Sequence, residues 1–514
     1  MAKTSPVLPR FPPPRHLDVA DITALPGDEQ LVLTTLQGIV NRTQPRIYMI
    51  SPVEEGARTW LDELRLPVDE ISDPWDLLAR YCGELGGAVV YDPGLPDSIN
   101  VALTLAGLEN AVVANPRLLD RGDTLSSSSS SLPIVADLRG RFRNKLEAYT
   151  WQREALWPRV NQRLLVGVPP AQGNRPYGGL LQDYAVAARA MAFWLNPDDP
   201  DERSLFEAIL DDTAPNTPYF GWFPADVAGE FQGVELASAR GIYTLAADLS
   251  ANLTVFAGMP RPRTRKADGS STSVIKPVAP NLENKIYLTL TFSEGDNLQY
   301  MQHRLRRLWD DPARGQIPLN WSVNPLAWEI APTILAYYLR TRTANDTLIA
   351  GPSGAGYMSP DLWPAAALPA FLRQSATFMR HAGIETGWIY NRRKGESQPL
   401  SPTTARAYAE VMPGGILLNY EPHSQVSLLE GRLPQAVTWG VNNPGDVSRA
   451  LLSAALEWDG QRPLFLSLGL LAWTFTPTAI VSLMRDLPPE YQIVGASDFF
   501  RLVTMAHERG LPPT

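Results

Sequence analysis

Cysteine is nearly absent from this chain, because Cys82 is the single cysteine in 514 residues. One cysteine cannot form an intramolecular disulfide, so a disulfide-stabilised secreted framework is excluded. Long apolar runs are missing too, since no uninterrupted stretch approaches the roughly 20 residues of a membrane-spanning helix. The proline-rich start also lacks the apolar segment of a secretory signal. We therefore expect a soluble, cytoplasmic protein with no membrane partner.

Basic residues and histidines are also scarce. The chain has 45 Lys and Arg against 54 Asp and Glu, a formal net charge of -9, and a pI near 5.3. A nucleic-acid surface needs an excess of Lys and Arg on one face, so nucleic acid is not an expected partner. The five histidines are scattered without a His-x-x-x-His pair, and we predict no metal and no other cofactor. The oligomeric state does not follow from the sequence.

The length and composition indicate more than one globular domain. A chain of 514 residues with 44% hydrophobic residues exceeds the size of one ordinary hydrophobic core. Stretches rich in proline, glycine and serine resist regular structure and mark the predicted boundaries. We predict a proline-rich tail over 1–15, an N-terminal α/β accessory region over 16–260, a linker over 261–282 and a barrel domain over 283–510. A subdivision of the N-terminal region near 160–180 is left open.

The N-terminal region alternates strand-like and helical patterns. Runs rich in apolar and β-branched residues lie at 46–50, 87–91, 111–114 and 164–168, with helix-like segments between them. The alanine-rich stretch 183–195 predicts a helix, and the aromatic stretch 219–224 predicts a loop. This alternation indicates α/β layers.

A more regular alternation follows the predicted linker. Strand-like segments lie at 285–292, 317–323, 348–351, 386–390, 415–420, 436–440, 463–468 and 491–494. Most of them precede a helical pattern, which is typical of a (β/α) barrel. The fold class is therefore α/β. Because residues 421–435 form a poor helical pattern, the barrel has either eight strands or seven, with an irregular closure as an alternative.

Carboxylates follow two of the predicted barrel strands. In such barrels the functional side chains come from the loops at the carboxyl ends of the strands. Glu294, Asp296 and Asn297 follow the first strand, and Glu421 follows the fifth. Glycoside cleavage needs one carboxylic acid to protonate the leaving oxygen and a second carboxylate as base or nucleophile, so we predict Glu294, Asp296 and Glu421 as catalytic. The alternatives are a helix cap for Asp296 or Asn297 and a surface acid for Glu421.

The other strand exits are polar and partly aromatic, a mixture that suits a sugar. Amides and carboxylates bind hydroxyl groups, while an aromatic ring packs on the C–H face of a sugar. The predicted substrate-binding residues are Asn297, Asn324, Ser353, Tyr357, Asn391, His423 and Trp473. Trp321, Trp328 and Trp388 fall inside strand or helix patterns, so we expect them in the core.

The stretch 354–360, Gly-Ala-Gly-Tyr-Met-Ser-Pro, resembles the signature of the GxGYxYP putative glycoside hydrolase family. Residues 36–48 and 182–195 are similar to that family's N-terminal domain, and 293–297 is similar to its Ser-Asp-Gly-Asp-Asn stretch. The resemblance implies a barrel-like C-terminal domain and a role in sugar processing. Ser359 stands where the signature has its second tyrosine, which removes an aromatic platform. Glu294 stands in place of aspartate and keeps the charge.

Two other functions stay open. Residues 291–295, Thr-Phe-Ser-Glu-Gly, resemble the Thr-Phe-Asp-Asp-Gly motif of polysaccharide deacetylases, which would require a zinc ion and histidine ligands. A glycan-binding or assembly protein would keep the same fold without turnover, because a fold does not by itself imply a function. The sugar, its linkage and the stereochemical course are not predicted.

Overall fold

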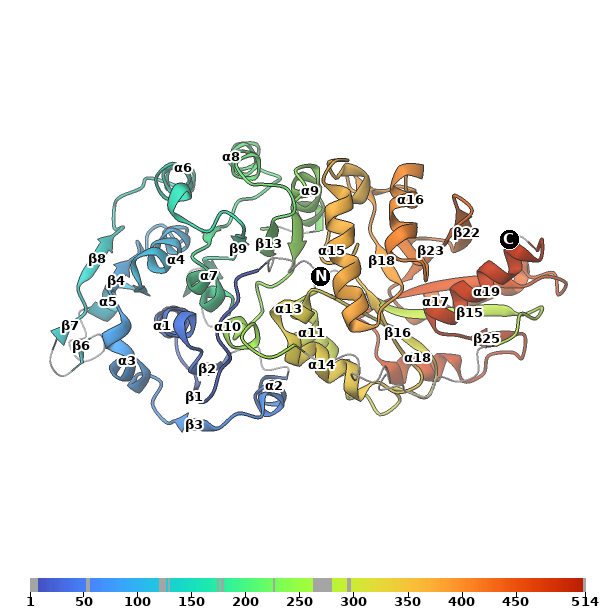
Figure 1. The fold of residues 1–514 in the computed structure, drawn as a ribbon, viewed down its shortest axis with the longest axis horizontal. Coiled ribbons are helices and arrows are strands. Elements are labelled where there is room, and N and C mark those ends of the chain that lie inside the picture. The colour runs from blue at the N-terminus through green and yellow to red at the C-terminus, as the bar shows by residue number, and fades with distance from the viewer. Residues whose placement is uncertain are drawn as a thin grey trace, which may run out of the picture. The chain divides into compact units, whose positions relative to one another are not determined.

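The computed structural model describes residues 8–51, 56–119, 126–127, 130–172, 175–176, 180–224, 227–261, 280–293 and 297–511. The chain forms two compact units, Met1–Arg261 with Glu329–Ile334 and Pro262–Trp328 with Leu335–Thr514 (Figure 1). Most of the predicted linker lies outside the described residues, and the predicted domain limits stay a prediction. Within the predicted tail, the described residues 8–15 bury Leu8 and Phe11.

The first unit contains three small parallel sheets. One has the order β2-β1-β3, the next β5-β4-β8 and the third β12-β9-β13-β14. The strands are β1 (Leu17–Asp21), β2 (Ile47–Ile50), β3 (Val68–Ile71), β4 (Gly87–Val90), β5 (Ala111–Ala114), β8 (Ile134–Asp137), β9 (Leu165–Gly167), β12 (Met191–Phe193), β13 (Pro218–Gly221) and β14 (Tyr243–Leu245). Short hairpins add β6 (Ser126–Ser127) with β7 (Ser130–Ser131), and β10 (Ala171–Gln172) with β11 (Arg175–Pro176).

Helix α1 (Gly27–Thr43) is buried over almost its whole length and contacts β2 of the first sheet and β5 of the second. A Cβ added at Gly38 would lie 2.5 Å from the backbone oxygen of Asp183, so the glycine lets α1 approach α7 (Gln182–Ala188) closely. The remaining helices are α2 (Ala57–Leu64), α3 (Asp76–Tyr81), η1 (Cys82–Glu84), α4 (Ser98–Glu109), α5 (Pro116–Leu119), α6 (Lys145–Leu156), η2 (Trp157–Arg159), α8 (Pro200–Asp211), α9 (Val227–Ala239) and α10 (Leu253–Phe256).

Two local predictions for the first unit were wrong. The helix predicted over 183–195 ends at Ala188, because Arg189 takes a left-handed conformation with φ 54°, and Met191–Phe193 then pairs with β9 as a strand. The aromatic stretch 219–224 was predicted as a loop, yet its first residues belong to β13, which lies between β9 and β14. In both places the pairing partner, which is distant in sequence, decides the structure.

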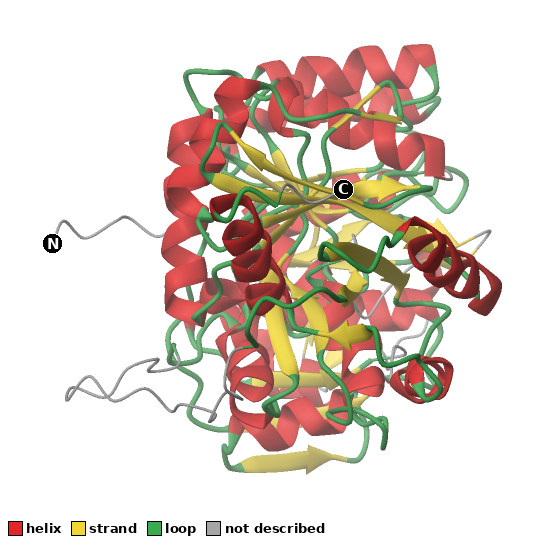
Figure 2. Ribbon diagram, turned by 90° about the vertical axis from the view of Figure 1, so that its right-hand side faces the viewer, coloured by secondary structure: helices red, strands yellow, loops and turns green. Residues whose placement is uncertain are grey.

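The second unit is built on a closed barrel of seven parallel strands, which confirms the predicted fold class. The order is β15-β16-β17-β18-β21-β23-β24, and β24 returns to β15. The strands are β15 (Ile286–Ser293), β16 (Leu319–Val323), β17 (Asp346–Ala350), β18 (Gly387–Ile389), β21 (Ile416–Glu421), β23 (Leu433–Val441) and β24 (Leu464–Leu471). Figure 2 shows strands in yellow with helices in red around them.

The eighth predicted strand, β25 (Tyr491–Ile493), is not a full member of the barrel wall. Strand β24 pairs with β15 along the whole of Ile286–Ser293, so no place is left between them. Instead β25 pairs with the other edge of β15 over its first residues, and β16 takes that edge further along. Residues 421–435, which form a poor helical pattern, contain β22 (Gln425–Leu429), an antiparallel neighbour of β23. The irregular seven-stranded alternative therefore holds.

Helices follow the barrel strands, and aromatic side chains fill the space between the two layers. Phe292 stacks on Trp321 with ring centroids 4.8 Å apart, and Trp309 contacts Trp321 edge-on. The helices are α11 (Gln299–Gln302), α12 (Arg304–Trp309), α13 (Ala327–Ile330), α14 (Pro332–Thr341), η3 (Pro360–Leu362), α15 (Leu368–Ala382), α16 (Pro402–Val411), α17 (Pro444–Glu457), α18 (Pro477–Met484) and α19 (Ala496–Glu508), and a hairpin pairs β19 (Arg392–Arg393) with β20 (Glu396–Ser397).

Trp321, Trp328 and Trp388 are buried, which confirms their prediction as core residues. Among the described residues, no helix is both long enough and apolar enough to span a bilayer.

Candidate functional site

The carboxyl ends of parallel barrel strands meet at one mouth, and β15 reaches it at Ser293. The next residues, 294–296, lie outside the described part of the chain, so the predicted catalytic residues Glu294 and Asp296 are not among the described residues. The described mouth therefore consists of Ser293, the chain from Asn297 onward and the exits of the other strands.

Three large aromatic side chains fill the lumen beside Ser293. They are Trp388, Tyr390 and Tyr420, and we call them the aromatic layer. Their ring centroids lie 4.8 to 6.1 Å apart. Two glycines on the next two strands, β23 and β24, face this layer, because a Cβ at Gly469 would lie 2.4 Å from Tyr420 Cε1 and one at Gly440 would lie 2.9 Å from Tyr420 Cδ1. The rings of Trp388 on β18 and Tyr420 on β21 therefore occupy space that side chains on β23 and β24 would fill if Gly440 and Gly469 were larger residues.

Replacing Gly469 by alanine is expected to destabilise the protein by about 1–3 kcal/mol, because the new methyl group overpacks the aromatic layer. It would also lie 2.6 Å from Trp388 Cη2, so neither ring can simply turn away. Urea denaturation measures the loss. Gly83→Ala is the matched control, since a Cβ there meets nothing within 4 Å. Equal stability of the two variants would contradict this packing.

Ser293 joins the end of β15 to the aromatic layer. Its hydroxyl lies 3.4 Å from the Tyr390 hydroxyl, and its backbone oxygen accepts a hydrogen bond from the Tyr420 hydroxyl at 3.4 Å. Burial, with smaller contributions from Tyr420 and Tyr357, raises the pKa of Tyr390 well above its ordinary value. The Tyr390 hydroxyl therefore stays protonated at neutral pH and able to donate.

Two predicted amides, Asn297 and Asn324, are fully buried near the ends of β15 and β16. Asn297 donates from Nδ2 to the Ser322 hydroxyl at 3.1 Å. Asn324 accepts from the Leu326 amide at 2.8 Å through Oδ1, while its Nδ2 has no hydrogen-bond partner within the described chain. A buried donor without an acceptor costs about 1–3 kcal/mol. Asn324 Nδ2 is therefore a buried donor whose hydrogen-bonding capacity is not used within the described residues.

The glycine-rich turn after β17 is packed into the structure. The Ser353 hydroxyl donates to the Met358 backbone oxygen at 2.7 Å and accepts from the Tyr390 amide at 3.2 Å. Gly354 has φ +123°, and a Cβ there would lie 2.8 Å from Ser375 Oγ. Tyr357 is buried with its ring 5.3 Å from that of Tyr390. The turn thus contacts Tyr390 of the aromatic layer through Ser353 and Tyr357.

Asn391 has a comparable internal role. Its side chain donates to Asp361 Oδ2 at 2.9 Å and to the Pro399 backbone oxygen at 2.9 Å, and its Oδ1 accepts from the Asp361 amide. Ser359, at the position of the signature's second tyrosine, is buried and accepts from the Arg392 amide at 3.3 Å. Both side chains fix the loops beside the mouth.

The remaining predicted residues are more accessible. Glu421 is half-buried at the end of β21, directly after Tyr420, and His423 is exposed. Trp473 follows β24 and is 45% exposed, which is unusual for so large an apolar ring. Glu421 and His423 lie at the exit of β21, and Trp473 lies at the exit of β24.

The structure thus brings Ser293 together with Tyr390 and Tyr420, which the sequence-based site prediction did not include. A signal for them exists, because each tyrosine comes directly before a predicted site residue, Asn391 or Glu421. The matching glycines on β23 and β24 carry no comparable signal, since their role appears only when the barrel is closed.

Within the described residues, one grouping of three side chains has the types and spacing that could hold a metal ion. It consists of His16, Asp18 and Asp69, in the first unit. Asp18 is already bound, since it accepts from Arg80 Nη1 and from the Tyr81 hydroxyl, each at 2.5 Å. This grouping is therefore an ion-pair cluster on sheet β2-β1-β3.

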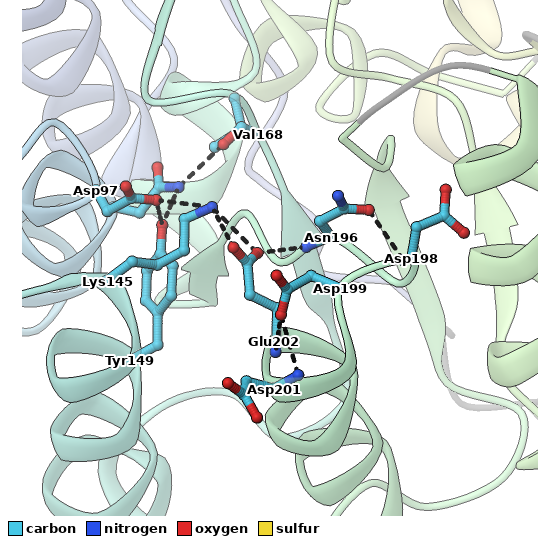
Figure 3. A network of polar contacts seen from close by, with 10 residues as sticks. Asp97, Lys145, Tyr149, Val168, Asn196, Asp198, Asp199, Asp201 and Glu202 are labelled. Atoms are coloured by element: carbon cyan, nitrogen blue, oxygen red, sulfur yellow. Dashed lines mark hydrogen bonds and ion pairs between the residues drawn. The ribbon is translucent and has the colours of Figure 1, made fainter.

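A second polar network in the first unit is centred on Lys145 (Figure 3). Its Nζ lies 3.1 Å from Glu202 Oε2 and 3.8 Å from Asp97 Oδ1, and the Tyr149 hydroxyl donates to the same Asp97 oxygen at 2.9 Å. Burial raises the pKa of Asp97, while Lys145 acts in the opposite direction. The network holds α6 against α8 and the start of α4.

Replacing Lys145 by methionine is expected to lower the free energy of unfolding by about 1–3 kcal/mol at pH 7, because two part-buried carboxylates lose their cation. The loss should shrink at acidic pH, where Asp97, whose pKa burial raises, takes up a proton. Lys285→Met is the matched control, since Lys285 lies 3.9 Å from the exposed Glu283. Equal losses in both variants, measured by urea denaturation, would contradict the assigned role.

Four domains of one family match consecutive parts of this chain. The GxGYxYP_N first domain matches residues 16–82, the second 85–160, and the GxGYxYP third domain 171–258. The GxGYxYP putative glycoside hydrolase C-terminal domain matches residues 284–504, which contain the whole barrel and its mouth. The chain belongs to the GxGYxYP family. The resemblance drawn from the signature turn is thereby confirmed over most of the chain.

A solved structure shows the same fold over the whole length. It is a putative hydrolase from Bacteroides thetaiotaomicron VPI-5482, 21% identical, with a TM-score of 0.83 and 98% of each chain covered. The glycosyltransferase SnogD from Streptomyces nogalater is 10% identical over 98% of this chain and 96% of its own, with a TM-score of 0.15. No curated protein matches this chain.

Proposed function

We propose that the barrel mouth binds a carbohydrate and cleaves a glycosidic bond, with Glu294 or Asp296 acting together with Glu421. The family membership supports the reaction class, since its C-terminal domain is described as a putative glycoside hydrolase domain. The Bacteroides thetaiotaomicron protein that shares the fold is likewise described as a putative hydrolase.

The observation that carries the proposal is the contact between Tyr420 and Ser293. The Tyr420 hydroxyl lies 3.4 Å from the Ser293 backbone oxygen, across a barrel in which β15 and β21 are not neighbours. In the sequence, Ser293 directly precedes Glu294 and Tyr420 directly precedes Glu421. The residues that directly precede Glu294 and Glu421 are therefore joined by one hydrogen bond, from the Tyr420 side chain to the Ser293 backbone.

Such an arrangement suits two carboxyl groups that act on one bond. One protonates the leaving oxygen, and the other either activates water or attacks the anomeric carbon. The first route requires carboxyl groups roughly 6.5–9.5 Å apart and the second roughly 5–5.5 Å. The aromatic layer lies beside Ser293, at the exit of the strand that precedes Glu294 and Asp296.

Two further groups are proposed to bind the sugar. The exposed ring of Trp473 offers a flat apolar face, and Asn324 Nδ2 offers a buried donor. A sugar presents a C–H face and hydroxyl oxygens, which match these groups. Ser353 and Asn391 are proposed to shape the mouth, since their polar atoms already bind the loops.

Release of sugar from a panel of aryl and oligosaccharide glycosides tests the function. Replacing Trp473 by alanine is expected to raise KM about 3- to 10-fold with little change in kcat, because stacking of this size contributes about 0.5–1.5 kcal/mol. Leu456→Ala is the control, since Leu456 is 79% exposed on α17 and has no proposed role. Sugar binding by calorimetry without any product would instead establish a glycan-binding protein and overturn the proposal.

A further inference from the structure

A hollow in the first unit is lined by an unusual number of arginines. It has a volume of about 590 Å³, which is enough for a small organic molecule. The arginines come from five separate segments, namely the chain before β1, the end of α1, η2, the loop before β9 and the residue after α7. They are Arg10, Arg42, Arg159, Arg163 and Arg189.

The hollow contrasts with the charge of the whole chain. Acidic residues outnumber basic residues by 54 to 45 overall, yet no Asp or Glu is among the described residues that line the hollow. Arg159 has a carboxylate partner outside the lining, because its Nη2 lies 2.6 Å from Glu109 Oε1. For Arg42, Arg163 and Arg189, the described residues provide no carboxylate within 4.0 Å. Arg10 interacts with the charge of Glu329, so the positive charges without a carboxylate partner are those of Arg42, Arg163 and Arg189.

Arg42 shows how this charge is held in place. Its guanidinium donates to the backbone oxygens of Ala187 at 3.0 Å, Val186 at 2.5 Å and Gly107 at 2.9 Å, and to Asn110 Oδ1 at 2.6 Å. All four acceptors are neutral, so the cation is fixed but not neutralised. Burial, and then the charge of Arg189, lowers the pKa of Arg42 to about 10, which leaves it protonated at neutral pH.

The walls of the hollow are built before any ligand arrives. The Tyr184 hydroxyl donates to the Pro9 backbone oxygen at 3.3 Å. The Phe11 ring packs edge-on against the Tyr184 ring, with ring centroids 5.8 Å apart. The Asn161 amide donates to the Arg189 backbone oxygen at 2.8 Å, which fixes the loop before β9 against the end of α7. A ligand therefore meets positioned cations at little cost in ordering the protein.

We propose that this hollow binds a small molecule that carries a phosphate group. A phosphate monoester bears a charge of about −1.5 to −2 at pH 7 and three acceptor oxygens, which match several guanidinium forks better than a single carboxylate does. Phe11 and Val160 add apolar surface for the organic part of the ligand. The site lies in the first unit and contains none of the residues proposed for the reaction in the barrel.

Calorimetry on the full chain with phenyl phosphate tests this proposal, with benzoate as the carboxylate probe of similar size. We expect phenyl phosphate to bind and to bind at least ten times more tightly than benzoate, with an affinity that falls as salt rises. The double variant Arg163→Gln/Arg189→Gln should weaken binding at least 10-fold. Both side chains are exposed, so the fold should persist, and circular dichroism checks it.

Two further variants make the test specific. Arg485→Gln, which removes an exposed arginine of the second unit, should leave the affinity unchanged. Arg163→Lys/Arg189→Lys should give an intermediate affinity, because lysine keeps the charge but loses the planar fork. The proposal is overturned if phenyl phosphate does not bind at millimolar concentration, if the Gln double variant binds it equally well, or if benzoate binds as tightly.

Discussion

Replacing Glu421 by glutamine, or Asp296 by asparagine, is expected to lower kcat for glycoside hydrolysis by at least about 100-fold. General acid or base catalysis by one positioned carboxyl group contributes about 10²- to 10⁴-fold, and an amide of the same shape cannot exchange the proton. We expect the larger effect on kcat rather than on binding, since both substitutions keep the size of the side chain and one acceptor oxygen. Initial rates over a range of substrate concentrations separate kcat from KM.

Matched controls for these two variants are exposed acids at the end of one helix and just after another. Glu508→Gln at the end of α19 and Asp486→Asn after α18 remove exposed acids of the same unit. Both should retain the activity of the unmodified protein. A Glu421→Gln variant as active as Glu508→Gln would show that Glu421 is a surface acid, which is the alternative that its sequence position leaves open.

The second large effect concerns stability and comes from Asp183 in α7. This side chain is fully buried, and its Oδ2 accepts from the Thr254 amide at 3.1 Å and the Thr254 hydroxyl at 2.7 Å. Its Oδ1 has no hydrogen-bond partner among the residues that the structure describes. Burial outweighs the Thr254 hydrogen bonds and raises the pKa of Asp183 from 3.8 to about 7.

A carboxyl whose pKa is raised on folding binds its proton more tightly in the folded state. Its contribution to stability is therefore fully present below pH 3.8 and is lost as the pH rises to about 7. The size of this loss is on the order of 4 kcal/mol. Asp183→Asn removes the titration while keeping the acceptor for Thr254. The variant should gain stability relative to the unmodified protein as the pH rises from about 4 to about 7.5.

Urea denaturation of both proteins across this pH range measures the difference. Only the difference matters, because other carboxyl groups titrate in both proteins alike. Asp486→Asn, an exposed acid, should follow the unmodified protein at every pH. A stability difference between Asp183→Asn and the unmodified protein that does not vary with pH would contradict the assigned pKa.

The barrel follows closely from the sequence because each strand is apolar and bounded by polar turns. The fifth and seventh strands, for example, begin within one residue of the predicted Gly415 and Pro463. What the sequence could not supply is the partner of each strand. The last strand looks like the others in sequence, but β24 already occupies the edge of β15 that an eighth strand would need.

The candidate site is only partly predictable, because contacts between strands distant in sequence also decide which side chains meet there. Asn297, Asn324 and Glu421 were predicted from their positions after strands, and they lie near strand ends in the structure. Tyr390 and Tyr420 were not, because the contact of Tyr390 with Ser293 and the space that Gly440 and Gly469 leave for Tyr420 exist only in the closed barrel. The polar side chains of Ser353 and Asn391 suggested sugar binding, yet their hydrogen bonds serve the surrounding loops.

A double-mutant cycle on Asp296 and Glu421 tests the central claim most directly. If acids from the β15 and β21 exits act on one glycosidic bond, the double variant Asp296→Asn/Glu421→Gln should lose about as much activity as the more impaired single variant. Losses that multiply would show that the two groups act independently. No loss in either single variant, with glycoside hydrolysis intact, would place the chemistry elsewhere in the protein.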